Sequence, residues 1–303
     1  MGAHNELGGL YKNRGAAGQS PMPFGNYVLN KSHPLYQNLV ACVASCNGMV
    51  EMVKNRPPIV ETGSPSFNGD NWTLDRASAE SIVFEIGDGD DRLTWQTGRG
   101  MTLFSLHGRP TKNAGAHETA LAVYDNSYSS EKHVHLTSTG YDPEGRMSVH
   151  VGRRYDGRVY SAYAAAVYDV YNDSDRQATC GVIWSDPATT YTTIEIYQNA
   201  ELTKSVTSTS VKTYQTMDID RLRFGRAENT RGGYWDSTIE LGLAFDRKLT
   251  AHEVQSLTND PYGLIIPAWL AGLDFYRRTG EIPPAEGILI PYYYQTLLAN
   301  GMN

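Results

Sequence analysis

The chain has 303 residues, of which 40% are hydrophobic and 19% charged, so it is long enough and apolar enough to bury a sizeable core. Its formal net charge is −7, which argues against a protein that binds nucleic acid through a basic stripe. It contains no run of about 18 apolar residues, the length that a membrane-spanning helix needs, so we expect neither nucleic acid nor membrane as a partner.

Residues 1–33 hold six glycines and a cluster of turn-forming residues at Ser20, Pro21 and Pro23. Such a segment cannot bury enough apolar surface to fold alone, so we predict an extended N-terminal arm. It has neither the basic start nor the apolar stretch of a secretory signal, and we expect no such signal.

Residues 34–263 consist of short apolar runs separated by Gly, Asn, Asp and Pro, a pattern typical of an all-β sandwich. Apolar and polar residues alternate in residues 81–86, 147–151 and 192–197, as in strands with one face on a core. Residues 101–106 are apolar on both faces and predict a strand that is covered on both sides.

The clearest alternation lies in residues 237–245. One predicted face carries Ile239, Leu241, Leu243 and Phe245, and the other carries Thr238, Glu240, Gly242 and Ala244. This pattern predicts a half-buried core strand with Glu240 facing outward.

A short helix is predicted after this strand. Thr250 and Glu253 form the sequence pattern of a capping box, with Leu249 and Val254 at the positions of a hydrophobic staple. Asp260-Pro261 ends the helix, because the residue before a proline disfavours the helical backbone.

Residues 264–303 are aromatic-rich and are interrupted by Pro283, Pro284 and Pro291. The aromatic residues that we predict to bind a partner are Trp269, Phe275, Tyr276, Tyr292, Tyr293 and Tyr294. This tail is too short for a core of its own, so it covers either its own sandwich or another protein, and the prolines favour a partner.

Several segments resemble laminin-G-like and concanavalin A-like jelly-roll domains, in the branch found in phage and prophage proteins. They are residues 31–40, 84–91, 194–201, 223–226 and 234–262, the last matching over the longest stretch. Ala200 stands where the family's hairpin turn has glycine. The resemblance implies an antiparallel two-sheet jelly roll over residues 34–263.

The resemblance also implies a virion protein that decorates a capsid or belongs to a tail or fibre. Its partners would be other virion proteins, its location the virion, and its assembly a homo-oligomer held by the arm and the tail. The alternative is a carbohydrate-binding module of a host-adhesion device, with a host surface glycan as partner. A glycan-active enzyme is a second alternative.

Catalytic motifs are absent from the sequence. It contains neither the Glu-x-Asp-x-x-Glu strand of concanavalin-like glucanases nor a Gly-x-Ser-x-Gly nucleophile elbow. Since fold alone never establishes an activity, we expect no enzyme and assign no catalytic residues.

Two groups of residues have the chemistry of metal ligands. Asp88, Asp90 and Asp91 could hold calcium, but Asp-Gly sequences also form turns, which we favour. His133 and His135 alternate on a predicted strand, but without a third ligand nearby in the sequence we favour two solvent- or partner-facing imidazoles. We therefore expect neither a metal site nor a cofactor.

Cys42, Cys46 and Cys180 are predicted to be reduced thiols, because three cysteines cannot form a disulfide framework.

Tyrosines are concentrated in one region of the sequence, at Tyr155, Tyr160, Tyr163, Tyr168 and Tyr171. Their rings would stack on sugars, bind a protein or pack on the sheet.

Overall fold

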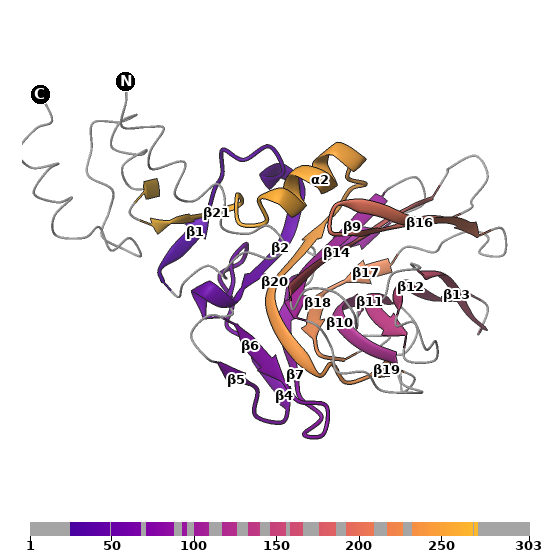
Figure 1. Cartoon of the computed structure of the whole chain (residues 1–303), viewed down its shortest axis with the longest axis horizontal. Helices are drawn as coiled ribbons and strands as arrows, with labels where there is room; N and C mark the ends of the chain where they lie inside the picture. The colour runs from indigo at the N-terminus through magenta and orange to yellow at the C-terminus, as the bar shows by residue number, and fades with distance from the viewer. Residues whose placement is uncertain are drawn as a thin grey trace, which may run out of the picture.

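The computed structural model describes residues 25–48, 50–67, 71–87, 93–95, 100–108, 117–125, 133–139, 146–155, 158–165, 176–185, 192–208, 217–226, 232–268 and 270–271. Within them, two large sheets pack face to face (Figure 1). Neighbouring strands are antiparallel, except for the short pair β10–β19. The predicted all-β sandwich is confirmed.

The first sheet runs β16-β15-β14-β9-β20-β2-β3, with β6 beside the start of β20 and β5 beside β6. The bounds of these strands are β2 Leu39–Ala44, β3 Val50–Glu51, β5 Ser66–Phe67, β6 Trp72–Leu74, β9 Gly100–Gly108, β14 Arg176–Ser185, β15 Thr192–Gln198, β16 Glu201–Ser208 and β20 Ser237–Phe245.

The second sheet runs β13-β12-β11-β10-β18-β7-β4, with β19 beside β10. The bounds of these strands are β4 Ile59–Thr62, β7 Ser81–Glu85, β10 His117–Tyr124, β11 His133–Thr139, β12 Arg146–Tyr155, β13 Arg158–Ala165, β18 Arg221–Phe224 and β19 Gly232–Gly233. A two-stranded ribbon joins β8 (Leu93–Trp95) and β17 (Met217–Ile219).

The core between the sheets is tightly packed, and two glycines allow the close approach. A Cβ atom at Gly181 would lie 2.7 Å from Val149 and 2.9 Å from Leu136, and one at Gly242 would overlap the Phe224 ring. Both glycines belong to the first sheet, and all three of their neighbours belong to the second. Glycine at these positions therefore lets the two layers meet, as the close packing of protein interiors requires.

The predicted strands 81–86, 147–151 and 192–197 place their apolar residues in this core as expected. β9 is buried on both faces over nearly its whole length, which confirms the prediction for 101–106. These strands are recognisable in the sequence because burial on one face or on two gives different hydrophobic patterns.

β20 differs from its prediction in two respects. It forms the expected core strand, but residues 239–245 are buried on both faces. A register irregularity between Ile239 and Leu241 places Ile239 in the core between the sheets, on the opposite face from Leu241. Leu241, Leu243 and Phe245 pack beneath the helix α2 (Ala251–Asn259), while Ala244 faces the other sheet. The alternation in this segment is between large and small side chains, rather than between buried and exposed ones.

The hairpin between β15 and β16 turns at Asn199 and Ala200, both of which have positive φ angles of 49° and 75°. Two consecutive positive φ angles are the requirement of a type I′ turn. The turn therefore forms with alanine in the place that glycine occupies in the resembled family. The Asn199 side chain supports it by accepting a hydrogen bond from the Ala178 backbone N–H at 2.9 Å.

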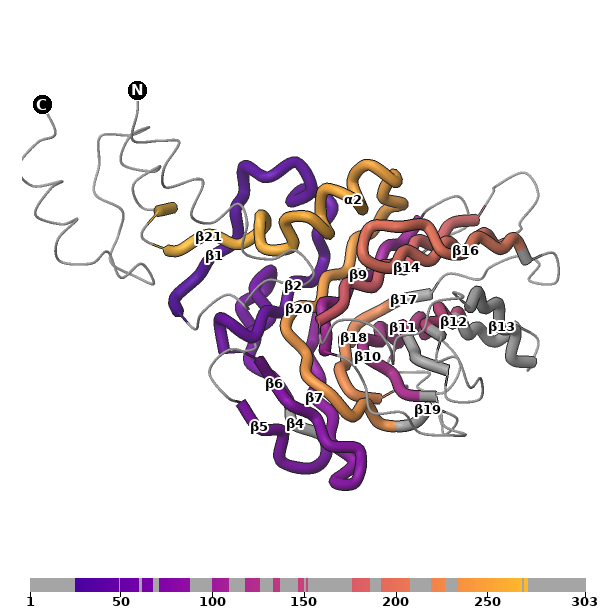
Figure 2. Tube along the Cα trace, in the orientation of Figure 1, coloured from indigo at the N-terminus to yellow at the C-terminus, as the bar shows by residue number. Residues whose placement is uncertain are grey.

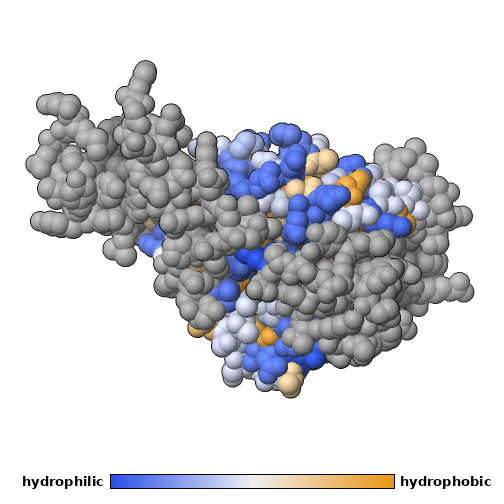
Figure 3. Space-filling model, in the orientation of Figure 1, coloured by the Kyte–Doolittle hydropathy of each residue, from blue (hydrophilic) through white to orange (hydrophobic). Residues whose placement is uncertain are grey.

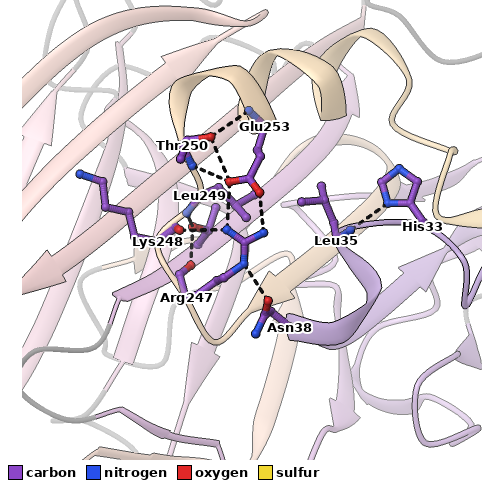
Figure 4. Close-up of polar contacts among 9 residues, drawn as sticks. His33, Leu35, Asn38, Arg247, Lys248, Leu249, Thr250 and Glu253 are labelled. Carbon is purple, nitrogen blue, oxygen red and sulfur yellow. Dashed lines mark hydrogen bonds and ion pairs between the residues drawn. The ribbon is translucent and has the colours of Figure 1, made fainter.

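The predicted capping box is present at the start of α2 (Figure 4). The Thr250 hydroxyl accepts a hydrogen bond from the Glu253 backbone N–H at 3.3 Å, and the Glu253 carboxylate accepts one from the Thr250 N–H at 2.9 Å. Arg247 adds two hydrogen bonds to that carboxylate, at 2.9 and 2.7 Å. The Arg247 guanidinium lowers the pKa of Glu253 to about 2, so the carboxylate stays charged.

Replacing Thr250 with alanine is expected to lower the free energy of unfolding by about 0.5–2 kcal/mol, because the amide of Glu253 loses its acceptor. The measurement is the urea midpoint of the full chain. Thr250→Ser, which keeps the hydroxyl, should stay close to the parent. An unchanged midpoint in the alanine variant would show that the box contributes nothing to stability.

Residues from the predicted arm and the predicted tail form one ribbon. β1 (Tyr27–Leu29) pairs with β21 (Ile265–Pro267), and the two strands lie side by side at the edge of the sandwich (Figure 2). Tyr27 is buried against the cluster that α2 covers. Residues 25–29 and 264–268 are thereby held together on one part of the molecule.

Candidate functional site

Five side chains from separate segments gather at one end of the sandwich, and we call them the end cluster. They are Arg76, Glu118, Arg226, Tyr234 and Asp236. Arg76 follows β6, Glu118 lies at the start of β10, Arg226 follows β18, and the last two lie between β19 and β20.

Strand register brings these segments together. The start of β20 pairs with β6, so Ser237 lies opposite Leu74. β19 pairs with the start of β10, so Gly233 lies opposite Glu118. A backbone hydrogen bond of 2.8 Å from Trp235 to Gly225 holds the end of β18 beside the same segment.

Charge in the end cluster centres on Arg76. Its guanidinium donates a hydrogen bond to Glu118 Oε1 and lies 3.8 Å from Asp236. Glu118 is fully buried, whereas the Arg76 and Asp236 side chains are 29% and 26% exposed. The cluster thus extends from a buried carboxyl group to the surface.

Glu118 has an unusual environment. Burial raises its pKa to about 7, although Arg76 opposes that shift. Its Oε2 atom has no hydrogen-bond partner within the part of the chain that the structure describes. An unpaired buried oxygen is costly, and such groups concentrate at functional sites.

An aromatic–cation pair completes the end cluster. The Arg226 guanidinium lies 5.1 Å from the centre of the Tyr234 ring, and both residues are half-buried. Trp235, next in the chain, is fully buried and meets the His107 ring edge-on at 4.9 Å. Trp235 therefore anchors the segment, while its two neighbours reach solvent.

A second polar group lies on the outer face of the second sheet, the face turned away from the core. His133 and His135 stack with their ring centres 4.8 Å apart and their planes 4° from parallel. On the next two strands of the sheet, the guanidinium of Arg223 (β18) lies 4.8 Å from the centre of the ring of Tyr124 (β10). Burial lowers the pKa of His133 to about 4, so its imidazole is neutral at pH 7.

The sequence predicted that these histidines face solvent or a partner, but both side chains are buried within the chain. His133 is 3% exposed and His135 is 5% exposed. Among the described side chains, no group of three His, Cys, Asp or Glu residues is arranged to hold a metal ion.

Glu240, predicted to face outward, is 3% exposed. It accepts two contacts from Arg176, at 3.0 and 2.5 Å, and a hydrogen bond from the Tyr262 hydroxyl at 3.3 Å. The outward prediction was wrong because a salt bridge compensates the buried charge. This group is structural.

Many of the predicted site residues lie outside the described part of the chain. These are Trp269, Phe275, Tyr276, Tyr292, Tyr293 and Tyr294, the possible calcium ligands Asp88, Asp90 and Asp91, and Tyr168 and Tyr171. Of the tyrosine-rich region, only the backbone of β12 and β13 is described.

The three cysteines are free and buried, as expected of reduced thiols. Burial raises the pKa of Cys42 and of Cys180, which keeps both thiols protonated and unreactive.

The sequence alone did not identify the end cluster, because its members are spread from residue 76 to residue 236 and form no local motif. One signal was available. Tyr234 and Asp236 flank a tryptophan just before the most recognisable strand, where a polar and aromatic segment enters the core.

The described surface on the side seen in Figure 3 is mainly hydrophilic, with small separate hydrophobic areas. Ile59 and Leu202 are the large hydrophobic side chains that are exposed in the described part of the chain, and they lie on different sheets. No helix in that part is both long and apolar enough to cross a membrane.

No protein-family model matches the sequence, and no curated protein sequence matches it either. Solved structures do match. The binding domain of botulinum neurotoxin serotype G is 14% identical over 75% of this chain and 52% of its own, with a TM-score of 0.51. The receptor binding domain of the botulinum neurotoxin C/D mosaic serotype is 11% identical over 73% of this chain and 51% of its own, with a TM-score of 0.52.

A weaker match is the CBM40 of the Ruminococcus gnavus IT-sialidase bound to α2,3-sialyllactose. It is 16% identical over 54% of this chain and 84% of its own, and its TM-score of 0.40 is too low to support an inference. This chain spans about half the length of the neurotoxin domains. At such low identity, the likeness to those domains establishes a shared β-sandwich fold.

Proposed function

We propose that this protein is a binding domain that recognises carbohydrate on a surface receptor through the end cluster. The observation that carries the proposal is the unpaired oxygen of buried Glu118 beside the half-exposed pair Arg226–Tyr234. The fold supports it, because the similar neurotoxin structure is a receptor binding domain.

The chemistry of the end cluster suits a sugar. The face of an aromatic ring such as Tyr234 packs against the C–H groups of a pyranose, while the phenol stays in water. Sugar hydroxyls both donate and accept hydrogen bonds; the partly exposed Asp236 carboxylate accepts and the partly exposed Arg76 guanidinium donates, while the fully buried Glu118 holds Arg76 in place. Apolar contact with a few convergent polar groups is the usual composition of a small-molecule site.

Binding without catalysis is part of the same proposal. A glycosidase needs two carboxyl groups on opposite sides of one glycosidic bond. In the end cluster, Arg76 contacts both Glu118 and Asp236, so the two carboxyl groups share one cation. The two carboxyl groups therefore hold the Arg76 side chain in one position, where it can bind a ligand.

The placement on a virion, with a host glycan as ligand, stays a prediction from the resemblance. It depends on residues 1–33 and 264–303, the proposed attachment segments. A carbohydrate-binding domain carried on a phage particle would be an adhesion device, so this placement is compatible with the proposed activity.

A glycan array probed with the full chain tests the proposal. We expect selective binding, and at least a tenfold weaker affinity for Tyr234→Ala and for Glu118→Gln, about 1.4 kcal/mol each. The matched control is Trp184→Ala, which removes another half-buried aromatic ring that carries a cation, Lys248, at 3.2 Å.

Trp184 is at the far end of the first sheet from the end cluster, because it pairs with Gly100 while β20 starts beside His107. Its loss should leave sugar binding unchanged in protein that remains folded. The proposal fails if the parent chain binds no glycan, or if binding persists in both end-cluster variants.

A further inference from the structure

A fully buried polar network crosses three adjacent strands of the first sheet, β9, β14 and β15. Both ring nitrogens of His107 are hydrogen-bonded: Nδ1 lies 2.9 Å from the Gly108 carbonyl oxygen, and Nε2 lies 3.0 Å from the Thr179 hydroxyl. That hydroxyl is also hydrogen-bonded to the Gln198 amide at 3.0 Å, and the Gln198 amide to the Gln177 amide at 2.9 Å.

The network fixes the orientation of the His107 ring. Its four side chains are at most 1% exposed, so water does not compete for their hydrogen bonds. Hydrogen bonds in such a place are strong and make the groups that they join rigid. Apolar side chains of the same shape would fill this space at little cost in stability, so orientation is what the polar groups add.

The His107 ring in turn packs on Trp235. The two rings meet edge-on, with their centres 4.9 Å apart and their planes at 84°. Trp235 is fully buried, and its indole N–H has no hydrogen-bond partner in the described part of the chain. Ring packing, in which His107 is an aromatic neighbour, therefore determines how the indole is oriented.

Trp235 connects this packing to the end cluster. Tyr234 and Asp236, on either side of it, are half-buried, an alternation typical of an extended chain whose successive side chains point to opposite sides. The Trp235 backbone N–H donates a hydrogen bond of 2.8 Å to the carbonyl oxygen of Gly225, the residue before Arg226. Both members of the Arg226–Tyr234 pair are therefore next in the chain to a residue that Trp235 holds.

We propose that His107 is a positioning residue for the carbohydrate site, an inference that rests on the proposed function. It acts through Trp235. The network holds the imidazole, the imidazole holds the indole, and the indole holds Tyr234 and Asp236 where they meet the sugar.

The first measurement needs no glycan. Full chain labelled with 5-fluorotryptophan gives a fluorine NMR resonance for each of its five tryptophans, and Trp235→Phe identifies that of Trp235. Thr179→Val, which replaces the hydroxyl by a methyl group, should shift or broaden the Trp235 resonance. The resonance of Trp184, at the far end of the first sheet, should stay in place. Thr179→Ser, which keeps the hydroxyl, should keep the parent Trp235 resonance.

The second measurement is the affinity for the array glycan that the parent chain binds most tightly, at a temperature where circular dichroism shows each variant folded. Thr179→Val and His107→Phe, which keeps a ring without nitrogens, should bind about fivefold more weakly, because the residues that contact the sugar are held less precisely. Thr179→Ser should bind as the parent does. Ile183→Val controls for lost stability, because it is buried in the core on the same strand as Thr179 and should melt lower with unchanged affinity.

The inference is overturned if Thr179→Val leaves the Trp235 resonance in place or binds the glycan as tightly as the parent does. It is also overturned if Ile183→Val weakens binding as much as Thr179→Val, because lost stability would then be the cause. A parent chain that binds no array glycan defeats the proposed function, and the fluorine spectra then decide the role of His107. Should His107→Phe fail to fold, the two Thr179 variants decide.

Discussion

Replacing Glu240 with glutamine is expected to lower the free energy of unfolding by about 3–5 kcal/mol, the usual cost of breaking a buried ion pair. Glu240 and Arg176 are 3% and 7% exposed, and their side chains meet through two contacts of 2.5 and 3.0 Å. The amide would leave the Arg176 guanidinium charged and uncompensated in a buried place. The change is measurable as a lower urea midpoint.

Two further variants separate the charge effect from the loss of shape. Glu201→Gln changes an exposed glutamate on β16 and should stay within about 0.5 kcal/mol of the parent. The double replacement Glu240→Leu with Arg176→Met removes both charges and should recover most of the loss, because apolar residues often replace buried ion pairs at little cost. If Glu240→Gln were as stable as Glu201→Gln, the ion pair would not stabilise the fold.

Glu240 also shows where prediction from the sequence stops. Its strand was predicted from alternation, and the strand is present over the expected residues. The burial of its second face could not be inferred, because the compensating Arg176 is 64 residues away and belongs to a different strand. Polar residues mark the outside of a protein only when no distant partner neutralises them.

Local signals were the reliable ones. The Thr250–Glu253 box and the two-sided burial of β9 each depend on a few consecutive residues, and both are present. The residues that determine such local geometry lie within the cap or turn itself, because caps and turns satisfy backbone groups within three or four residues.

The candidate sites depend instead on strand order and register. Glu118 meets Arg76 only because β19 and β20 bring the start of β10 beside the end of β6. His133 lies beside Tyr124 only because β10 and β11 pair in one particular register. A register shift of one residue would turn every side chain of a strand to the other face, so neither site could be derived from spacing.

Replacing Leu241 with aspartate is expected to have the largest effect, with a loss of at least about 4–5 kcal/mol. Leu241 is fully buried in the cluster beneath α2, and it lies between Leu106 on β9 and Ala44 on β2. Aspartate removes the apolar contacts and adds a carboxyl group that finds no partner among these aliphatic neighbours. Since domains are stable by only about 5–15 kcal/mol, much of the variant should be unfolded at 25 °C.

Leu241→Ala measures the apolar part of this loss, expected at about 2–5 kcal/mol, so the difference between the two variants isolates the cost of the buried carboxyl group. Thr238→Asp introduces the same carboxyl group on the same strand, at a half-buried position opposite Thr73. It should therefore lose far less stability than Leu241→Asp. If the two aspartate variants melted at the same temperature, the middle of β20 would not be a core strand buried on both faces, and the packing of α2 on the first sheet would have to be reassigned.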